Sequence, residues 1–488
     1  MDLKSSARVF EILHSEITLV NSFKKRGKMN FLKFLLVFIC LYSTAIAQRD
    51  AFPRIKKLGG NVSPYQWPSV NPAWVVDLKD TKISDGDLKE LEEVKNFSSG
   101  YFMLLDVSGT TVTDNGLKFV SDAETLEWID LSNTAIDGSG FEHLRNLQRL
   151  KCIILQECKK INDKSLESLP PLKNLQSLNL RNTSITHVSM KKILTYKKLN
   201  ILNLRDTGIK NESVAMLASL KNLKGLDLGE TEISDSALEK MKDLKLQSLD
   251  LTKSKIVGSG LKFLSPEELL WIKLEGGNVT DEGMSGLKHL TSLQDLNLSG
   301  NSIGDKGLAK LKKLKDLSKM NLSSSKVTDK GLANLSGLAN LNQLILSKCK
   351  INGSGLNNLK KTNLAYLDVS ETLISENFSN LNELPDLRAL ILCQCMITDE
   401  MINKLKHHQM IVLEVSGNPI TDAGLAGIIK NLNLRFLSLE NCKGITDKSV
   451  AGLAELKEMD QLNLSGTSFT QKGIDVLKKK LPDANIIF

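Results

Sequence analysis

Residues 293–316, LQDLNLSGNSIGDKGLAKLKKLKD, define the unit from which most of this chain is built. The block that starts at Leu317, LSKMNLSSSKVTDKGLANLSGLAN, repeats the same order of residue types. A fixed period of this length is the signature of a repeat protein.

Within the unit, Leu293, Leu296 and Leu298 form an L-x-x-L-x-L pattern whose last two leucines alternate with polar residues, as in a half-buried strand. Asp305 stands where a helix N-cap is expected, and Leu308 and the leucine three residues later share the inward face of a short helix. One repeat is therefore predicted to be a strand, a turn and a helix. So short a unit cannot bury its leucines alone, so we expect the repeats to stack into a solenoid in which each strand pairs with the next.

We number each repeat from the first leucine of this pattern, which places Leu298 at position six. After a first step of 29 residues, every interval between position-six residues is 23, 24 or 25. This periodicity predicts one domain with about 17 repeats over residues 75–481, and a further step of 23 places Ile487 in a closing strand or cap over residues 482–488. The position-six residues are Leu78, Val107, Leu131, Leu155, Leu180, Leu204, Leu228, Leu251, Leu274, Leu298, Leu322, Leu346, Val369, Leu392, Val415, Leu439 and Leu464.

Residues 1–47 are typical of a secretory signal. KKRGKMNFLK, from residue 24, is a basic region, FLLVFICLYSTAIA is an apolar region, and Ala45-Ile46-Ala47 forms a cleavage site before Gln48. Met29 opens a more conventional signal, so residues 1–28 are interpreted as a possible upstream mis-start. The apolar region is short for a membrane span, so no stable span is expected after cleavage, with an uncleaved anchor as the alternative. Residues 48–74 are predicted to form an N-terminal cap, with Trp67 and Trp74 covering the first leucine layer.

This pattern resembles the leucine-rich repeat family over essentially the whole mature chain. The ITD or VTD sequence before GL, as at Thr328-Asp329 and Thr421-Asp422, resembles exported bacterial repeat proteins of the planctomycete type, and the helical side is similar to the cysteine-containing repeats of F-box adaptors. The resemblance implies an α/β solenoid, a horseshoe or arc with a parallel sheet on the concave face and short helices on the convex face. It also implies binding of a protein or ligand on the concave side, and no chemistry.

The charge of the chain is too weak to indicate nucleic acid as a partner. The formal charge is +8, and residues 1–47 hold seven of the basic and three of the acidic residues, which leaves about +4 after cleavage. Lys310, Lys312, Lys313 and Lys315 fall on the predicted outer helices, where a solvated face is expected.

No constellation of residues points to catalysis, a metal or a cofactor. The six histidines avoid the concave strand positions, and His407 and His408 fall on or after an outer helix. Four of the seven cysteines occupy position nine, the buried turn, where other repeats have Asn or Thr, and are too far apart to pair. We predict free structural thiols there, and expect Cys152 and Cys393 to be half-buried on the concave side. The position-nine cysteines are Cys158, Cys349, Cys395 and Cys442.

Positions three, five and seven are expected to face the concave side. Position five is mostly Asp or Asn and position seven mostly Ser, so larger side chains mark where a partner would bind. We predict one zone around Trp271 with Arg205 and Lys273, and a second from Tyr366 to Phe436. The alternative is that these side chains pack on one another and bind nothing. The predicted partner-binding residues are Trp128, Arg181, Ile201, Arg205, Trp271, Lys273, Glu275, Tyr366, Val412, Glu414, Phe436 and Glu440.

The sequence thus favours an exported, non-enzymatic scaffold, located in the periplasm, on the cell surface or outside the cell, that binds a protein or a glycan. An F-box-like substrate adaptor in ubiquitin-dependent degradation would need a docking domain before the repeats, where residues 1–47 look like a signal. A structural component of the cell envelope is a further alternative. The partner and the oligomeric state are not indicated by the sequence.

Overall fold

The computed structural model describes residues 53–65, 73–91, 101–406, 409–429 and 434–488. The predicted signal (1–47), Trp67, His407 and His408 lie outside these residues. Residues 54–488 form one compact unit. Among the described residues, no helix combines the length and the apolar character that crossing a membrane requires.

The described strands form one 19-stranded sheet that follows the chain order. From β2 to β19 each strand pairs in parallel with the next, and position six directly follows every strand from β2 to β18. The strands are β1 Asn61–Tyr65, β2 Ala73–Asp77, β3 Tyr101–Asp106, β4 Trp128–Asp130, β5 Cys152–Ile154, β6 Ser177–Asn179, β7 Ile201–Asn203, β8 Gly225–Asp227, β9 Ser248–Asp250, β10 Trp271–Lys273, β11 Asp295–Asn297, β12 Lys319–Asn321, β13 Gln343–Ile345, β14 Tyr366–Asp368, β15 Ala389–Ile391, β16 Val412–Glu414, β17 Phe436–Ser438, β18 Gln461–Asn463 and β19 Asn485–Ile487.

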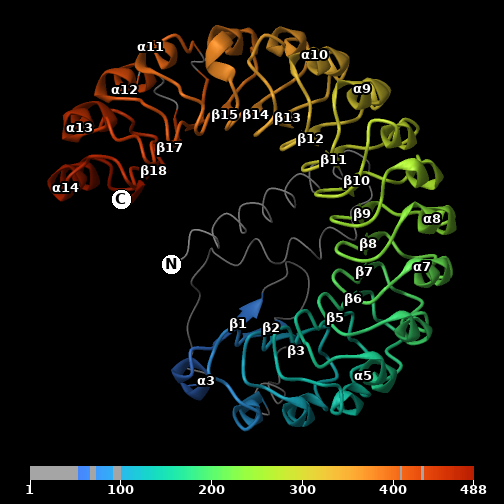
Figure 1. The fold of residues 1–488 in the computed structure, drawn as a ribbon. Coiled ribbons are helices and arrows are strands. Elements are labelled where there is room, and N and C mark those ends of the chain that lie inside the picture. The colour runs from blue at the N-terminus through green and yellow to red at the C-terminus, as the bar shows by residue number, and fades with distance from the viewer. Residues whose placement is uncertain (1–52, 66–72, 92–100, 407–408, 430–433) are drawn as a thin grey trace. The chain divides into compact units, whose positions relative to one another are not determined.

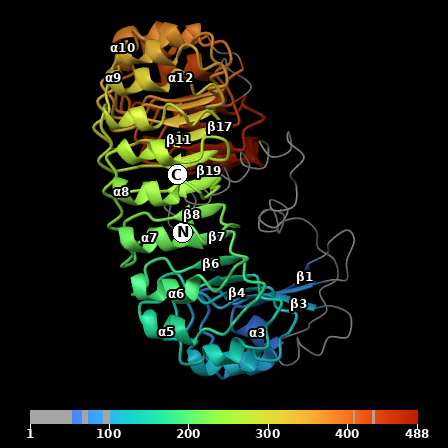
Figure 2. The same cartoon turned by 90° about the vertical axis from the view of Figure 1, so that its right-hand side faces the viewer.

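Short α-helices and 3-10 helices alternate with the strands and lie on the outer side of the curved sheet (Figures 1 and 2). The α-helices are α3 Pro53–Lys57, α5 Asp163–Ser168, α6 Met190–Ile193, α7 Asn211–Leu217, α8 Asp235–Leu238, α9 Asp305–Leu308, α10 Asp329–Leu332, α11 Asp399–Ile402, α12 Asp422–Ile429, α13 Val450–Leu453 and α14 Gln471–Lys480. The 3-10 helices are η2 Asp87–Glu90, η3 Asp114–Val120, η4 Phe141–Leu144, η5 His187–Ser189, η6 Glu239–Met241, η7 Ser259–Phe263, η8 Gly283–Gly286, η9 Ala309–Leu311, η10 Ala333–Leu335, η11 Leu356–Leu359, η12 Ile374–Glu383 and η13 Asp447–Ser449.

The core lies between the sheet and the helices. Leu293, Leu296 and Leu298 are fully buried, as are Leu308 and Leu311 from the helical side of the same repeat. Each such layer is covered by the layers of the repeats before and after it, which a single repeat could not achieve. The predicted fold class, an α/β solenoid with a parallel concave sheet and convex helices, is confirmed.

The two ends of the sheet are closed differently. At the start, β1 pairs antiparallel with β2, and Ile55 of α3 is buried there. Trp74, predicted to lie in the cap, belongs to β2 and is half-buried. At the other end, β19 pairs with β18 so that Ile487 lies opposite Asn463, which is at position five. The placement of Ile487 at position six was therefore wrong by one residue, because the last connection is one residue longer than the step of 23 assumed.

The prediction that Asp305 caps its own helix was wrong. The N-cap of α9 is Gly304, and the Asp305 carboxylate accepts hydrogen bonds from the amide and hydroxyl of Thr328 in the next repeat, at 2.9 and 2.7 Å. Equivalent contacts recur along the outer side. Thr446 donates to Asp422 in the same way, and Thr470 to Asp447. These carboxylates join neighbouring repeats, because the Asp of one helix start faces the Thr of the next.

Position eight adopts the left-handed backbone conformation in every repeat from β2 to β18. Only five of these residues are glycine, so most repeats accept a conformation that costs an L-residue roughly 1–2 kcal/mol. Stacking of the repeats fixes the turn and overrides the local preference. The residues are Asp80, Gly109, Asn133, Glu157, Asn182, Asp206, Glu230, Lys253, Gly276, Gly300, Ser324, Lys348, Glu371, Gln394, Gly417, Asn441 and Gly466.

Candidate functional site: the concave face

The Asp and Asn side chains at position five stabilise the turn that follows each strand. Asp130 Oδ1 accepts the amide of Ser132 at 2.9 Å, and Asn297 Oδ1 accepts the amide of Ser299 at 3.0 Å. The same bond, from position seven to position five, recurs at Asp106, Asn179, Asn203, Asp227, Asp250, Asn321, Asp368 and Asn463. This two-residue bond is an Asx turn, which fixes the chain as it leaves the strand.

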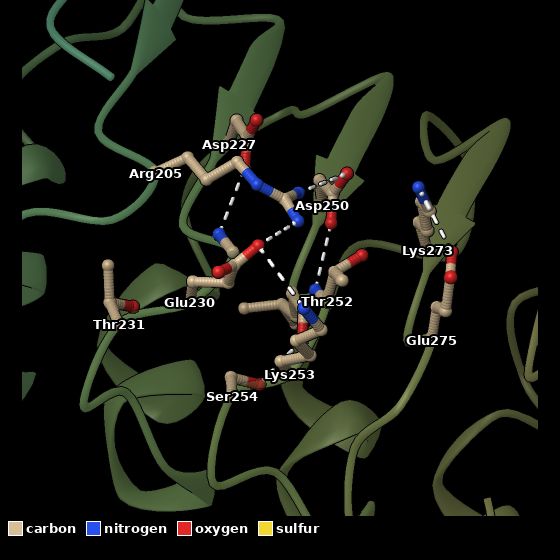
Figure 3. Close-up of polar contacts among 12 residues, drawn as sticks. Arg205, Asp227, Glu230, Thr231, Asp250, Thr252, Lys253, Ser254, Lys273 and Glu275 are labelled. Carbon is tan, nitrogen blue, oxygen red and sulfur yellow. Dashed lines mark hydrogen bonds and ion pairs between the residues drawn. The ribbon is translucent and has the colours of Figure 1, made fainter. Parts of the chain in front are cut away.

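Arg205 lies at the centre of a polar cluster that crosses three repeats (Figure 3). Its Nη2 is 2.7 Å from Glu230 Oε1, and its Nη1 is 3.5 Å from Asp250 Oδ2. The guanidinium reaches Asp250 by passing over Gly229, where a Cβ atom would lie 2.7 Å from Nη1. Lys253 adds a weaker contact to Glu230 at 3.7 Å. The Arg205 side chain is only 13% exposed, so its charge is largely matched within the chain.

The electrostatics of this cluster depend on burial. Burial raises the pKa of Asp227 to about 6, and the neighbouring Asp250 carboxylate adds to the effect. The hydrogen bond from Arg205 lowers the pKa of Glu230 below its ordinary value. Arg205 therefore balances a set of carboxylates that would otherwise repel one another.

The first predicted zone is not brought together as one group. Trp271 is half-buried in β10, between Ser248 of β9 and Asp295 of β11. Arg205 follows β7, three strands away, and is engaged in the cluster described above. Lys273 lies 3.1 Å from Glu275, which also accepts a hydrogen bond from the side chain of Asn297 at 3.3 Å. Two of the predicted contact residues thus form an ion pair with each other.

Three other predicted residues lie on or directly after the earlier strands and are half-buried. Trp128 is in β4, between Leu104 and Cys152 in the neighbouring strands. Ile201 is in β7, between Ser177 and Gly225. Arg181 follows β6 in the turn equivalent to that of Arg205.

The second predicted zone is brought together. Tyr366, Ala389, Val412 and Phe436 are aligned at position three of four consecutive strands, β14 to β17, and all four side chains are half-buried. We call this row the β14–β17 strip. Position five of the same strands runs Asp368, Ile391, Glu414 and Ser438, and Glu440 follows β17 at position seven.

The carboxylates beside the strip are partly buried. Burial raises the pKa of Glu414, and the charges of Asp368 and Glu440 raise it further. Burial also raises the pKa of Asp368. Among the described residues, no Lys or Arg lies within ion-pair distance of Asp368, Glu414 or Glu440.

The described cysteines are free, as predicted. At position nine, Cys158, Cys349, Cys395 and Cys442 each donate through Sγ to the position-six carbonyl of the preceding repeat. Cys393 is half-buried as expected, whereas Cys152, which lies between Trp128 and Ser177 of the neighbouring strands, is fully buried. Burial raises the pKa of both Cys152 and Cys393 to about 12. In the described part of the chain, no group of three or more His, Cys, Asp or Glu is arranged to hold a metal ion.

One exposed feature of this region was missed by the sequence analysis. Leu373 and Met396 are 61% and 69% exposed, the highest values among the large described hydrophobic residues. Both occupy position ten, in the repeats of β14 and β15. A comparison of position ten across the repeats, like that of positions three, five and seven, would have found them.

One family model matches the repeat type in two segments of the chain. The leucine-rich repeat family model matches residues 289–312 and 407–428. No curated protein matches the sequence. Among solved structures, a leucine-rich repeat protein of Leptospira interrogans is 19% identical, with 76% of this chain and 97% of that one covered and a TM-score of 0.48. An internalin of Listeria monocytogenes is 20% identical, with 71% and 88% covered and a TM-score of 0.42.

The fold and the concave face define a leucine-rich repeat solenoid. The assignment to this class rests on the L-x-x-L-x-L strands, their parallel register and the matched family segments. The solved structures are too distant to add to the assignment.

Proposed function

We propose that this chain is an exported, non-enzymatic scaffold that binds a partner protein on its concave face. The observation that carries the proposal is the half-burial of large side chains at position three, namely Trp128, Trp271, Tyr366 and Phe436. Aromatic side chains that retain exposed area on a rigid surface are those that contribute most to binding when a partner buries them, commonly about 2 kcal/mol or more each. The sheet holds them in fixed register, so little entropy is lost on binding.

Capture of a partner by the full chain tests this proposal. The bait is incubated with an extract and with the culture medium of the native cells, beside Trp271→Ala and Phe436→Ala. Lys310→Ala serves as the control, because Lys310 is exposed on the outer helical side. We expect a specific protein to be retained by the wild type and by Lys310→Ala and to be lost with at least one concave variant. Retention by both concave variants would contradict binding on this face.

Export is proposed from residues 24–47 and has its own test. The secreted chain is expected to begin at Gln48, as determined by N-terminal sequencing or intact mass. A chain that keeps residues 24–47 and is recovered only inside the cell would contradict export without affecting the binding proposal.

A further inference from the structure

We propose that the β14–β17 strip docks an extended segment of a partner protein in which apolar side chains alternate with lysine or arginine. This inference rests on the proposed function and deepens it, because it names the place on the concave face and the chemistry of the partner.

The apolar part of the segment is matched by the strip. Tyr366, Ala389, Val412 and Phe436 lie opposite one another in register, and neighbouring strands are about 4.8 Å apart, so the row is about 14 Å long. An extended chain covers this length with about four residues. Ile391, next to the row at position five, is 9% exposed and forms the floor between Asp368 and Glu414.

The cationic part is matched by the carboxylates. Asp368 and Glu414 lie on either side of Ile391, and Glu440 follows one strand further. In the cluster around Arg205, the chain itself supplies the cation that compensates concave carboxylates. Glu230 is 2.7 Å from the Arg205 guanidinium. Beside the strip no described Lys or Arg fills that role, and the charges of Asp368 and Glu440 raise the pKa of Glu414. A lysine or arginine from a partner would supply the missing cation next to an apolar contact.

The same repeats offer apolar surface beyond the strip. Leu373 and Met396 occupy the equivalent position of successive repeats and are the most exposed of the large described hydrophobic residues. Both side chains lie at position ten, beyond the ends of β14 and β15, and are not part of the β14–β17 strip. A second copy of this chain fits less well, because two identical strips would bring the carboxylates of both copies together.

Peptide binding to the full chain tests the inference. The probes are three labelled peptides of about eight residues, chosen to exceed the length of the row. One alternates lysine with valine, the second replaces each lysine with glutamate, and the third replaces each valine with serine. We expect fluorescence anisotropy to show binding of the lysine-valine peptide, at least about tenfold weaker binding of the other two, and weakening of the first as salt is raised.

The variants place the site. In Asp368→Asn/Glu414→Gln the carboxylates become neutral amides of the same shape. The amide oxygen introduced at position 368 can still accept the backbone amide of Ser370, as the Asp368 carboxylate does at 2.9 Å. We expect this variant to bind the lysine-valine peptide at least about tenfold more weakly. Val412→Ser tests the apolar row in the same way. Asp106→Asn, a position-five carboxylate of β3 that also has a raised pKa, is the matched control and should change binding less than about twofold.

Several results would overturn the inference. Equal binding of the lysine-serine peptide would show general attraction to cations, and equal loss with Asp106→Asn would place the site elsewhere. Self-association of the wild type that Asp368→Asn/Glu414→Gln abolishes, measured by sedimentation, would identify a second copy as the occupant. A partner captured by the wild type, lost with Trp271→Ala and retained by the strip variants would leave the proposed function standing and refute the inference alone.

Discussion

Asp163→Ala removes one complete carboxylate bridge between neighbouring repeats. Asp163, the first residue of α5, accepts the amide and hydroxyl of Thr186 at 2.8 and 2.7 Å and the amide of Ser189 at 3.2 Å, and the Ser189 hydroxyl also donates to it. Burial alone would raise the pKa of Asp163, but these hydrogen bonds lower it below the ordinary value. A lowered pKa means that the stabilisation is complete above about pH 4 and is lost as the pH falls through the folded-state pKa.

The expected cost of Asp163→Ala at pH 7 is about 3–4 kcal/mol. A hydrogen bond to a charged group contributes about 1.5–3 kcal/mol, but the four bonds share one carboxylate and water replaces part of them in the variant. Asp163→Asn should cost about 1 kcal/mol. Asn211 already occupies the equivalent place in α7, where it accepts the amide of Ser234 at 3.0 Å and donates to the Ser234 hydroxyl at 2.8 Å.

The assay combines urea unfolding with amide hydrogen exchange, because a repeat array can open locally before it unfolds. We expect faster exchange at Thr186 and Ser189 in Asp163→Ala, together with the loss of stability. Asp316→Ala is the control, since Asp316 is exposed and lies outside the helix starts that carry these bridges. If Asp163→Ala and Asp316→Ala differ by less than about 0.5 kcal/mol, the carboxylate bridges do not couple the repeats.

Three further predictions concern the concave side and the turns. Gly229→Ala places a methyl group about 2.7 Å from Arg205 Nη1, so we expect the guanidinium to leave Asp250 and the unfolding free energy to fall by about 1–2 kcal/mol. The loss should largely disappear when Asp250→Asn is also present. Burial, and then the nearby Asp106 charge, raise the pKa of Asp130 to about 6, so the native state binds more protons than the unfolded chain between about pH 4 and 6 and loses stability as the pH rises. Asp130→Asn should therefore be more stable than the wild type at pH 7.5, by up to about 3 kcal/mol, with the difference falling to about 1 kcal/mol in melts near pH 4.5. Asn301→Ala should cost about 3 kcal/mol in urea unfolding, because the buried side chain accepts the Val279 amide at 2.9 Å and donates to the Leu274 and Leu298 carbonyls at 2.8 and 2.9 Å. Asn301→Thr should cost about half as much, since Thr183 at this position keeps the bond to its own repeat.

Part of the candidate site could be predicted because strand geometry is periodic. Once position six is assigned, the side chains of positions three and five follow, and Tyr366, Val412 and Phe436 were predicted to share one zone before the register was known. The contacts that each side chain makes could not be predicted in this way. Arg205 was predicted to contact a partner. Instead it contacts Asp250, which is 45 residues later in the sequence, through the space left by Gly229.

The sequence by itself determined the repeat, its strands and its buried leucines, because these depend on the alternation and spacing of residues within about 24 positions. Only the tertiary structure decided which polar groups meet between repeats. Asp305 bonds Thr328 instead of capping α9, and position eight is left-handed even where it is Glu230 or Lys348. Both follow from stacking, which sets the distance between neighbouring repeats and so outweighs the local preference of a single residue.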